Sequence, residues 1–115
     1  MNCPRHFLDD GREVTVDVHG CTVANALFVI RRTVQEACWR GRTRVIVIHG
    51  RSREDRERTI RGELMRALDR GDFAEWVTAY TQGAAGGQST LYMPIGNARQ
   101  DRRIRLQDVG RRHGW

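Results

Sequence analysis

The chain has 115 residues, 39% of them hydrophobic and 30% charged, which fits one globular domain and excludes a wholly disordered protein. Its 20 basic residues, all arginine, outnumber 14 acidic ones, and the formal net charge of +6 favours nucleic acid or another polyanion as a partner. Three cysteines without Cys-x-x-Cys spacing argue against a disulfide framework, and the longest apolar stretch, Val23 to Ile30, is too short to span a bilayer. We therefore expect a cytoplasmic protein without a membrane segment.

The first half of the chain predicts a strand, a helix and a second strand. Residues 1–12 form a lead-in arm of mixed composition, and Val14 to Val18 then alternates apolar and polar residues, as a half-buried strand does. Thr22 is a suitable N-cap for a helix that ends at Gly41. The continuous β-branched run from Val45 to Ile48 is typical of a strand covered on both faces. Together these segments predict a βαβ unit with parallel strands.

The second half of the chain predicts one more helix and two more strands. Ser52 can cap a helix that Gly71 ends. Phe73 to Tyr80 has the composition of a third strand and Thr90 to Ile95 that of a fourth, with Gly83 to Gly87 as the loop between them. The order β-α-β-α-β-β predicts a two-layer α/β sandwich of the α+β type.

Composition divides the chain into an N-terminal arm (1–12), one domain (13–96) and a basic C-terminal tail (97–115). The tail holds six arginines against two aspartates, and one short element is expected around Ile104 to Val109. Either the tail is a solvated, disordered end, or its arginines add nonspecific, salt-sensitive affinity for a polyanion. The arginines in question are Arg99, Arg102, Arg103 and Arg105.

The residues with the clearest chemical potential follow the first two predicted strands. Because neighbouring parallel strands end at the same edge of a sheet, Asp17, His19 and His49 should converge there. Two imidazoles facing one substrate could divide the proton transfers of phosphodiester cleavage, and Asp17 could fix the tautomer of one ring. The alternative is that each His-Gly pair is only a turn whose ring bonds a nearby backbone group.

Three motifs between about Glu13 and Ile95 occur in an informative order. Asp17 to Thr22 reads Asp-Val-His-Gly-Cys-Thr and precedes a helix, Ile48 to Gly50 reads Ile-His-Gly at a strand end, and Gly86 to Thr90 reads Gly-Gly-Gln-Ser-Thr before the last strand. In sequence, order and placement these motifs resemble those of the small MutS-related, or Smr, domain family.

This resemblance implies the fold of the C-terminal domain of translation initiation factor three, which agrees with the predicted order of elements. It also implies nucleic-acid binding and, in several members, endonuclease or nicking activity on DNA or RNA. Asp17, His19 and His49 stand at the matching positions and are the active-site candidates. A binding module without catalysis and an interaction domain that never touches nucleic acid are the alternatives.

The second turn departs from the family pattern. The family commonly continues His-Gly-x-Gly, whereas Ser52 stands here in place of the second glycine, where glycine would let backbone amides approach phosphate closely. We expect phosphate contacts from the arginines that flank the turns and from the glycine-rich loop. The candidate nucleic-acid-binding residues are Arg42, Arg44, Gly50, Arg51, Ser52, Arg53, Gly86 and Gly87.

Cys21 suggests two further ideas, a nucleophile beside His19 or a metal ligand together with Asp17, His19 and His49. A buried structural thiol is the simpler explanation, and no paired cysteine spacing supports zinc. The sequence therefore predicts no metal site and no resident cofactor, although it leaves a divalent ion such as Mg²⁺ open. The oligomeric state and the choice between DNA and RNA are not determined.

Overall fold

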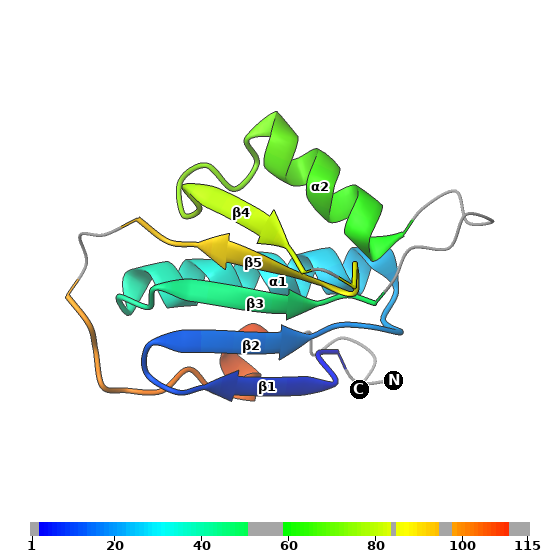
Figure 1. Cartoon of the computed structure of the whole chain (residues 1–115). Helices are drawn as coiled ribbons and strands as arrows, with labels where there is room; N and C mark the ends of the chain where they lie inside the picture. Colours follow the sequence, from blue (N-terminus) through cyan, green and yellow to red (C-terminus); the bar gives the residue numbers. More distant parts are fainter. Residues whose placement is uncertain (1–2, 51–58, 84, 95–97, 111–115) are drawn as a thin grey trace.

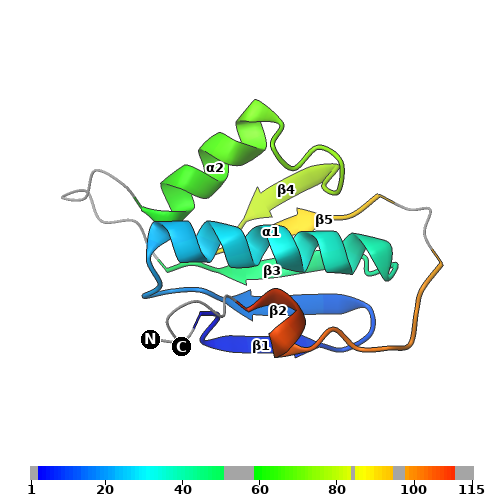
Figure 2. The same ribbon diagram turned by 180° about the vertical axis from the view of Figure 1, so that it is seen from behind.

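The computed structural model describes residues 3–50, 59–83, 85–94 and 98–110. One five-stranded sheet has the order β1-β2-β3-β5-β4, and the helices lie together on one face of it (Figures 1 and 2). This is the predicted two-layer arrangement. The strands are β1 (His6–Asp9), β2 (Glu13–Asp17), β3 (Arg44–Ile48), β4 (Ala79–Gln82) and β5 (Gln88–Tyr92), and the helices are α1 (Val23–Trp39), α2 (Ile60–Arg70) and α3 (Leu106–Val109).

The predicted βαβ unit is formed by β2, α1 and β3. The two strands are parallel, and the backbone N–H of Val18 extends their pairing by donating to the carbonyl of Ile48 at 2.9 Å. Thr22 caps α1, since its hydroxyl accepts the N–H of Asn25 at 3.2 Å. The prediction for this part of the chain is therefore confirmed in its elements and its strand direction.

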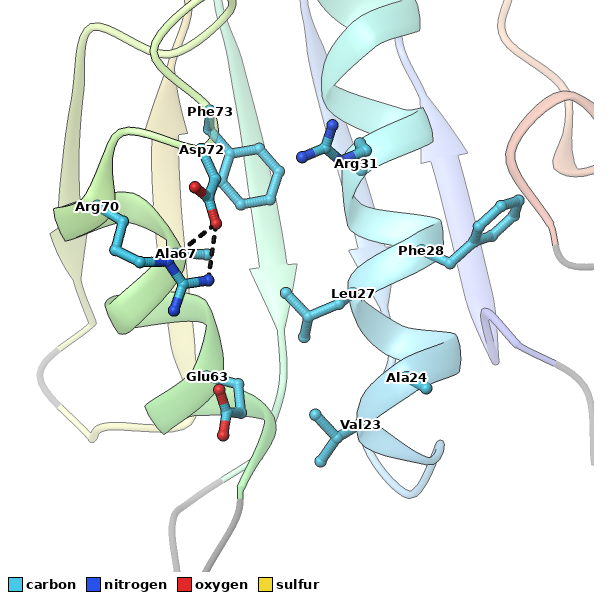
Figure 3. Close-up of a pocket in the computed structure, with 10 residues that line it drawn as sticks. All are labelled: Val23, Ala24, Leu27, Phe28, Arg31, Glu63, Ala67, Arg70, Asp72 and Phe73. Carbon is cyan, nitrogen blue, oxygen red and sulfur yellow. Dashed lines mark hydrogen bonds and ion pairs between the residues drawn. The ribbon is translucent and has the colours of Figure 1, made fainter.

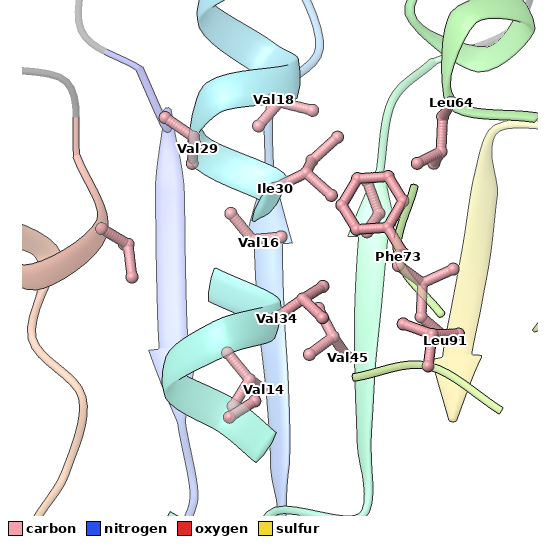
Figure 4. Packing of buried hydrophobic residues seen from close by; sticks show 14 of the residues in the cluster. Val14, Val16, Val18, Val29, Ile30, Val34, Val45, Leu64, Phe73 and Leu91 are labelled. Atoms are coloured by element: carbon pink, nitrogen blue, oxygen red, sulfur yellow. The ribbon is translucent and has the colours of Figure 1, made fainter. Parts of the chain in front are cut away.

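The core lies between the sheet and α1 (Figure 4). Alternate residues of β2 and β3 are fully buried against the helix, as strand geometry requires. Figure 4 shows Val14, Val16 and Val45 beside Ile30 and Val34 of α1. Apolar contact with the sheet is thus what fixes the helix in place.

The face of β3 that points away from the helices is less buried than predicted. We expected a strand covered on both faces, but burial alternates along β3, and Ile46 and Ile48 are only half-buried on the face away from the helices. The β-branched run therefore reflects strand propensity on a partly exposed face rather than a second covering layer.

The second helix begins later than predicted. α2 starts at Ile60, and the side chain of Thr59 caps it by accepting the N–H of Gly62 at 3.0 Å. The predicted cap at Ser52 is therefore wrong for this helix, and Ser52 itself lies outside the described residues. Gly71 ends α2 in a left-handed conformation with φ of 83°, as predicted.

The third strand is also shifted. Phe73 to Tyr80 was expected to be extended, but residues 73–76 form a turn and β4 begins only at Ala79. Phe73 and Trp76 are buried in this turn, so these large side chains pack into the core without belonging to a strand. The fourth strand, β5, lies two residues earlier than expected at its start and ends at Tyr92.

Residues 1–12 contain a strand that the sequence analysis did not predict. β1 pairs antiparallel with β2 and extends the sheet by one strand. The side chains of Asp9 and Arg42 form a two-pronged ion pair at 2.8 and 2.9 Å with neither side chain exposed, and Asp9 also accepts the backbone N–H of Ile104 at 2.8 Å. Burial raises the pKa of Asp9, but these bonds more than offset it, so its pKa lies below the usual value.

This buried ion pair ties the C-terminal segment to the sheet. Arg42 also donates to the carbonyls of Gln100 and Arg102, at 2.6 and 2.9 Å, and the expected short element is present as α3. α3 contacts α1, where Arg32 donates to the carbonyl of Asp108 at 3.3 Å. Residues 98–110 thus pack along the domain. None of the helices in the described ranges is both long and apolar enough to cross a membrane.

Candidate nucleic-acid interface

Three turns meet at one edge of the sheet, on the right in Figure 1. β2 and β3 both end there because they are parallel. The β4–β5 loop lies at the same edge because β5 runs antiparallel to β3, which places Gln88 opposite Ile48. A side chain added at Gly50 would lie 3.5 Å from the Cβ of His19, so the two His-Gly turns are in contact.

At the first turn, Asp17 holds His19. One carboxylate oxygen of Asp17, Oδ1, accepts the backbone N–H of His19 at 3.0 Å and the ring Nδ1–H at 2.5 Å. A carboxylate can only accept, so the hydrogen of the neutral ring is on Nδ1 and the Nε2 lone pair is free. The His19 side chain is 49% exposed, whereas that of Asp17 is 11% exposed. The first turn therefore presents an oriented, accessible proton acceptor.

At the second turn, His49 is part of the interior. It is 5% exposed, and its ring bonds the carbonyl of Gly50 through Nδ1 at 2.7 Å and the hydroxyl of Ser89 through Nε2 at 2.8 Å. Since the carbonyl only accepts, Nδ1 carries the hydrogen and Nε2 accepts from Ser89. Burial lowers the pKa of His49, the bond to Gly50 opposes this, and the charge of Arg61 lowers it further. The ring is neutral at pH 7 with both nitrogens engaged.

The two imidazoles lie on opposite faces of the sheet. His49 continues the buried side of β3 after Val45 and Val47, and Ser89 pairs with Val47 in register. Asp17 and His19 belong to the other face, away from the helices. The structure thus brings the turns together, but it does not turn both rings toward one substrate as we had expected.

The glycine-rich loop rests on the second turn. The carbonyl of Gly87 accepts the backbone N–H groups of both His49 and Gly50, at 3.1 and 3.0 Å. The N–H of Gly50 is therefore not available to a phosphate. Gly86 has φ of 75°, and a side chain at Gly86 or Gly87 would meet open space, so the loop backbone is accessible.

Comparison with known protein families identifies the family to which this chain belongs. A family model described as the Smr domain matches residues 16–93, which contain Asp17, His19, His49 and the loop. This chain is a member of the Smr domain family. The structure is also similar to the crystal structure of the Smr domain of Thermus thermophilus MutS2, with a TM-score of 0.57, 24% identity, and coverage of 70% of this chain and 96% of that one. No curated protein gives a significant match.

Two of the arginines predicted to contact phosphate are remote from the site of this Smr domain. Arg42 and Arg44 lie at the start of β3, at the opposite edge from His19 and His49. Arg42 is buried in its bonds to Asp9, and Arg44 pairs with Glu13 at 2.6 Å. The structure therefore does not bring these two arginines to the edge where the two His-Gly turns meet.

Of the tail arginines, Arg103 lies away from the turns, whereas Arg105 lines a pocket along β1 together with Arg5 and His6. Arg103 lies against Gly11 in the β1–β2 turn, and Gln100 donates to the carbonyl of Trp39 at the end of α1. Both places are at the far edge of the sheet. Arg51, Ser52 and Arg53, which follow Gly50 directly, lie outside the described residues.

Sequence reasoning missed three basic residues at the site edge of this Smr domain. Arg61, at the start of α2, bonds Gln82 at 2.5 Å, and its charge acts on His49. His6 of β1 is exposed and directly opposite Asp17, and Arg5 precedes it. A predicted strand in residues 1–12 would have revealed Arg5 and His6, but the run His6–Asp9 is too short and too mixed to signal one.

Cys21 is not set up as a nucleophile or a metal ligand. Burial raises its pKa, although a hydrogen bond with Cys3 and the charge of Arg5 oppose this, so the thiol remains protonated. Within the described ranges, no three His, Cys, Asp or Glu residues are placed to hold a metal ion.

A groove between α1 and α2 lies in the helical layer (Figure 3). Val23 and Leu27 of α1 point toward Ala67 and Glu63 of α2, while the guanidinium of Arg31 stacks 5.8 Å from the ring centre of Phe73. These apolar and paired groups lie in the helical layer. The groove therefore contributes no residue to the two His-Gly turns.

Proposed function

We propose that this Smr domain binds nucleic acid at the edge formed by the two His-Gly turns and cleaves the phosphodiester backbone there. The observation that carries the proposal is the bond between Asp17 and His19, which leaves an oriented Nε2 facing solvent. Smr domains are known as nucleic-acid-binding and nicking modules, and the excess of basic residues suits a polyanionic substrate.

His19 acts as the general base in this proposal. Its Nε2 takes a proton from the attacking water, or from a ribose hydroxyl in RNA, as the new bond to phosphorus forms. The bond from phosphorus to the leaving oxygen breaks, and solvent supplies the proton for that oxygen. Asp17 stabilises the imidazolium that results and keeps the ring in its productive orientation.

His49 has a positioning role. Its ring links the second turn to β5 through Ser89 and to its own backbone through Gly50. The carbonyl of Gly87 also accepts the backbone N–H groups of His49 and Gly50, so His49 helps to fix the position of Gly50. Removing His49 would therefore disturb binding through the turn rather than remove a proton acceptor.

Phosphate contacts come from the groups around the two turns. Arg51 and Arg53 follow Gly50 in the sequence, Ser52 carries a hydroxyl, and the open space at Gly87 lets its backbone approach a phosphate oxygen. The N–H of Gly86 already donates to the carbonyl of Gly83 at 3.0 Å. The phosphate contacts position the strand without reading its bases. The proposal therefore covers both DNA and RNA.

A binding module without catalysis is the second candidate, and the state of His49 favours it. Two free histidines could divide acid and base roles, but here one ring has both nitrogens occupied inside the protein. The two turns thus offer one accessible imidazole between them, that of His19, and such a site can hold a strand without cutting it.

Incubation with supercoiled plasmid and with structured RNA, with Mg²⁺ and with chelator, tests the proposal. We expect His19→Ala to lower the cleavage rate by about 10²- to 10⁴-fold. Arg12→Ala is the matched control, because Arg12 is exposed in the β1–β2 turn at the far edge of the sheet.

Equal product from the native protein and His19→Ala would show that His19 is not the base. Salt-sensitive binding without any product from the native protein would favour the binding module instead. Binding that does not depend on salt would contradict both candidates, because phosphate contacts release counterions.

A further inference from the structure

Arg5 occupies an unusual place at the candidate interface. It precedes β1, outside residues 16–93, and its backbone N–H donates to the carbonyl of Asp17 at 2.7 Å. A side chain added at Gly20 would lie 3.1 Å from Nη1 of Arg5. The guanidinium therefore lies over the glycine that follows His19.

The Arg5 side chain is exposed. Among the residues that the structure describes, no acidic side chain forms an ion pair with it. Arg42 and Arg44, in contrast, are each held by a carboxylate at the far edge. Among the described residues, Arg5 is thus a guanidinium without an ion-pair partner next to the glycine that follows His19.

The fold holds Arg5 there through β1. The strand is paired with β2 along its whole length, and its last residue, Asp9, is locked to Arg42 and to the N–H of Ile104. Sheet pairing at one end and a buried ion pair at the other fix the backbone. Only the side-chain torsions of Arg5 have to be ordered when a ligand binds.

We propose that Arg5 binds the phosphate on which His19 acts, which rests on the function proposed above. A guanidinium can donate two parallel hydrogen bonds to phosphate oxygens, and its charge compensates the negative charge that Asp17 brings to the site. Arg5 therefore supplies, from outside the residues matched by the family model, a phosphate contact at the first turn. The second turn has Ser52 in place of the family's phosphate-approaching glycine.

Gly20 explains why this contact is compatible with the turn. Its φ of 78° requires a residue without a side chain, and the absence of Cβ leaves the space that Arg5 fills. The turn and the arginine are thus complementary in shape.

The test is a binding titration of short fluorescein-labelled single strands of DNA and of RNA, followed by anisotropy at several salt concentrations. We expect Arg5→Ala to weaken binding about tenfold and to reduce the slope of log affinity against log salt by roughly one. Arg12→Ala, a change of the same charge at the other end of the β1–β2 hairpin, should leave affinity within about twofold of the native value. Arg5→Lys, which keeps the charge, should recover part of the loss and the salt slope.

The outcomes separate this inference from the function on which it rests. If the native protein binds neither strand, the proposed function fails and Arg5 has no phosphate to hold. If the native protein binds and Arg5→Ala and Arg12→Ala lose affinity equally or not at all, the role of Arg5 alone is refuted. Thermal melting of all variants reports on the fold, and an Arg5→Ala loss that Arg5→Lys does not recover in a fully folded protein also contradicts the charge contact.

Discussion

The first and second His-Gly turns have nearly the same sequence but opposite surroundings. His19 stands on the exposed face of the sheet, bonded through one nitrogen to Asp17, whereas His49 lies under the helical layer with both nitrogens bonded. The difference follows from strand parity, since His19 shares a face with Asp17 and His49 shares a face with the buried Val45 and Val47. A repeated motif thus supplies one chemical group and one structural group.

The similar sequences of the two turns overstate the number of imidazoles that can act on one substrate. Two imidazoles at equivalent strand ends suggest an acid and a base, but the rings would have to lie on the same face to share a substrate. Here the pairing of β2 with β3 aligns the turns without aligning the rings. Only the Asp17–His19 pair keeps the geometry of a proton-transfer group.

The two histidines should differ most in how much each contributes to the stability of the fold. His49→Ala leaves the Ser89 hydroxyl and the Gly50 carbonyl without partners and opens a buried gap, so we expect the free energy of unfolding to fall by about 2 to 4 kcal/mol. His19→Ala removes a half-exposed ring, and we expect a loss below about 1 kcal/mol. Urea unfolding followed by circular dichroism measures both, and equal losses would contradict the assignment of the two rings.

A smaller effect should appear in the pH dependence of stability. The pKa of His49 is lowered by burial, so the unfolded chain binds a proton more readily than the folded one. His49 contributes fully to the free energy of unfolding above the ordinary histidine pKa of about 6.5. This contribution is lost as the pH falls through the lowered pKa of the folded state. Unfolding free energies measured between pH 7 and 5 should therefore decrease toward acid.

His49→Gln is the test variant for that experiment, and His6→Gln is its control. The slope of the unfolding free energy against pH should be smaller in His49→Gln than in the native protein. It should be unchanged in His6→Gln, because His6 is exposed. Asp9, whose pKa is also lowered, loses its contribution only near and below the ordinary aspartate value of about 4, outside this window. A slope unchanged by His49→Gln would mean that another group causes it.

Much of the fold could be predicted because its elements carry local signals. The alternation in β2, the N-cap of α1 at Thr22 and the apolar run of β3 are visible in the sequence, and together they predicted the parallel unit at the centre of the sheet. The buried aromatic turn at residues 73–76 could not be predicted, because its side chains pack like those of a strand while its backbone does not pair.

The candidate site was predictable only in part. Asp17 and His19 lie close in sequence, so their contact follows from local geometry. The partner of His49 is 40 residues away in β5, and Arg5 is brought to the turn by a strand with no sequence signature. Arg42 was predicted to contact phosphate because it flanks a turn in the sequence, although its partner, Asp9, depends on the tertiary arrangement of β1.

The most direct test of the central claim is an NMR titration of the histidine ring nitrogens with a short single-stranded oligonucleotide. We expect the Nε2 resonance of His19 to shift on binding, and the ring of His49 to stay in its neutral, Nδ1-protonated form without a comparable shift. A shift of the His49 ring as large as that of His19 would show that both imidazoles face the ligand. That result would contradict the division of the two turns into one chemical and one structural group.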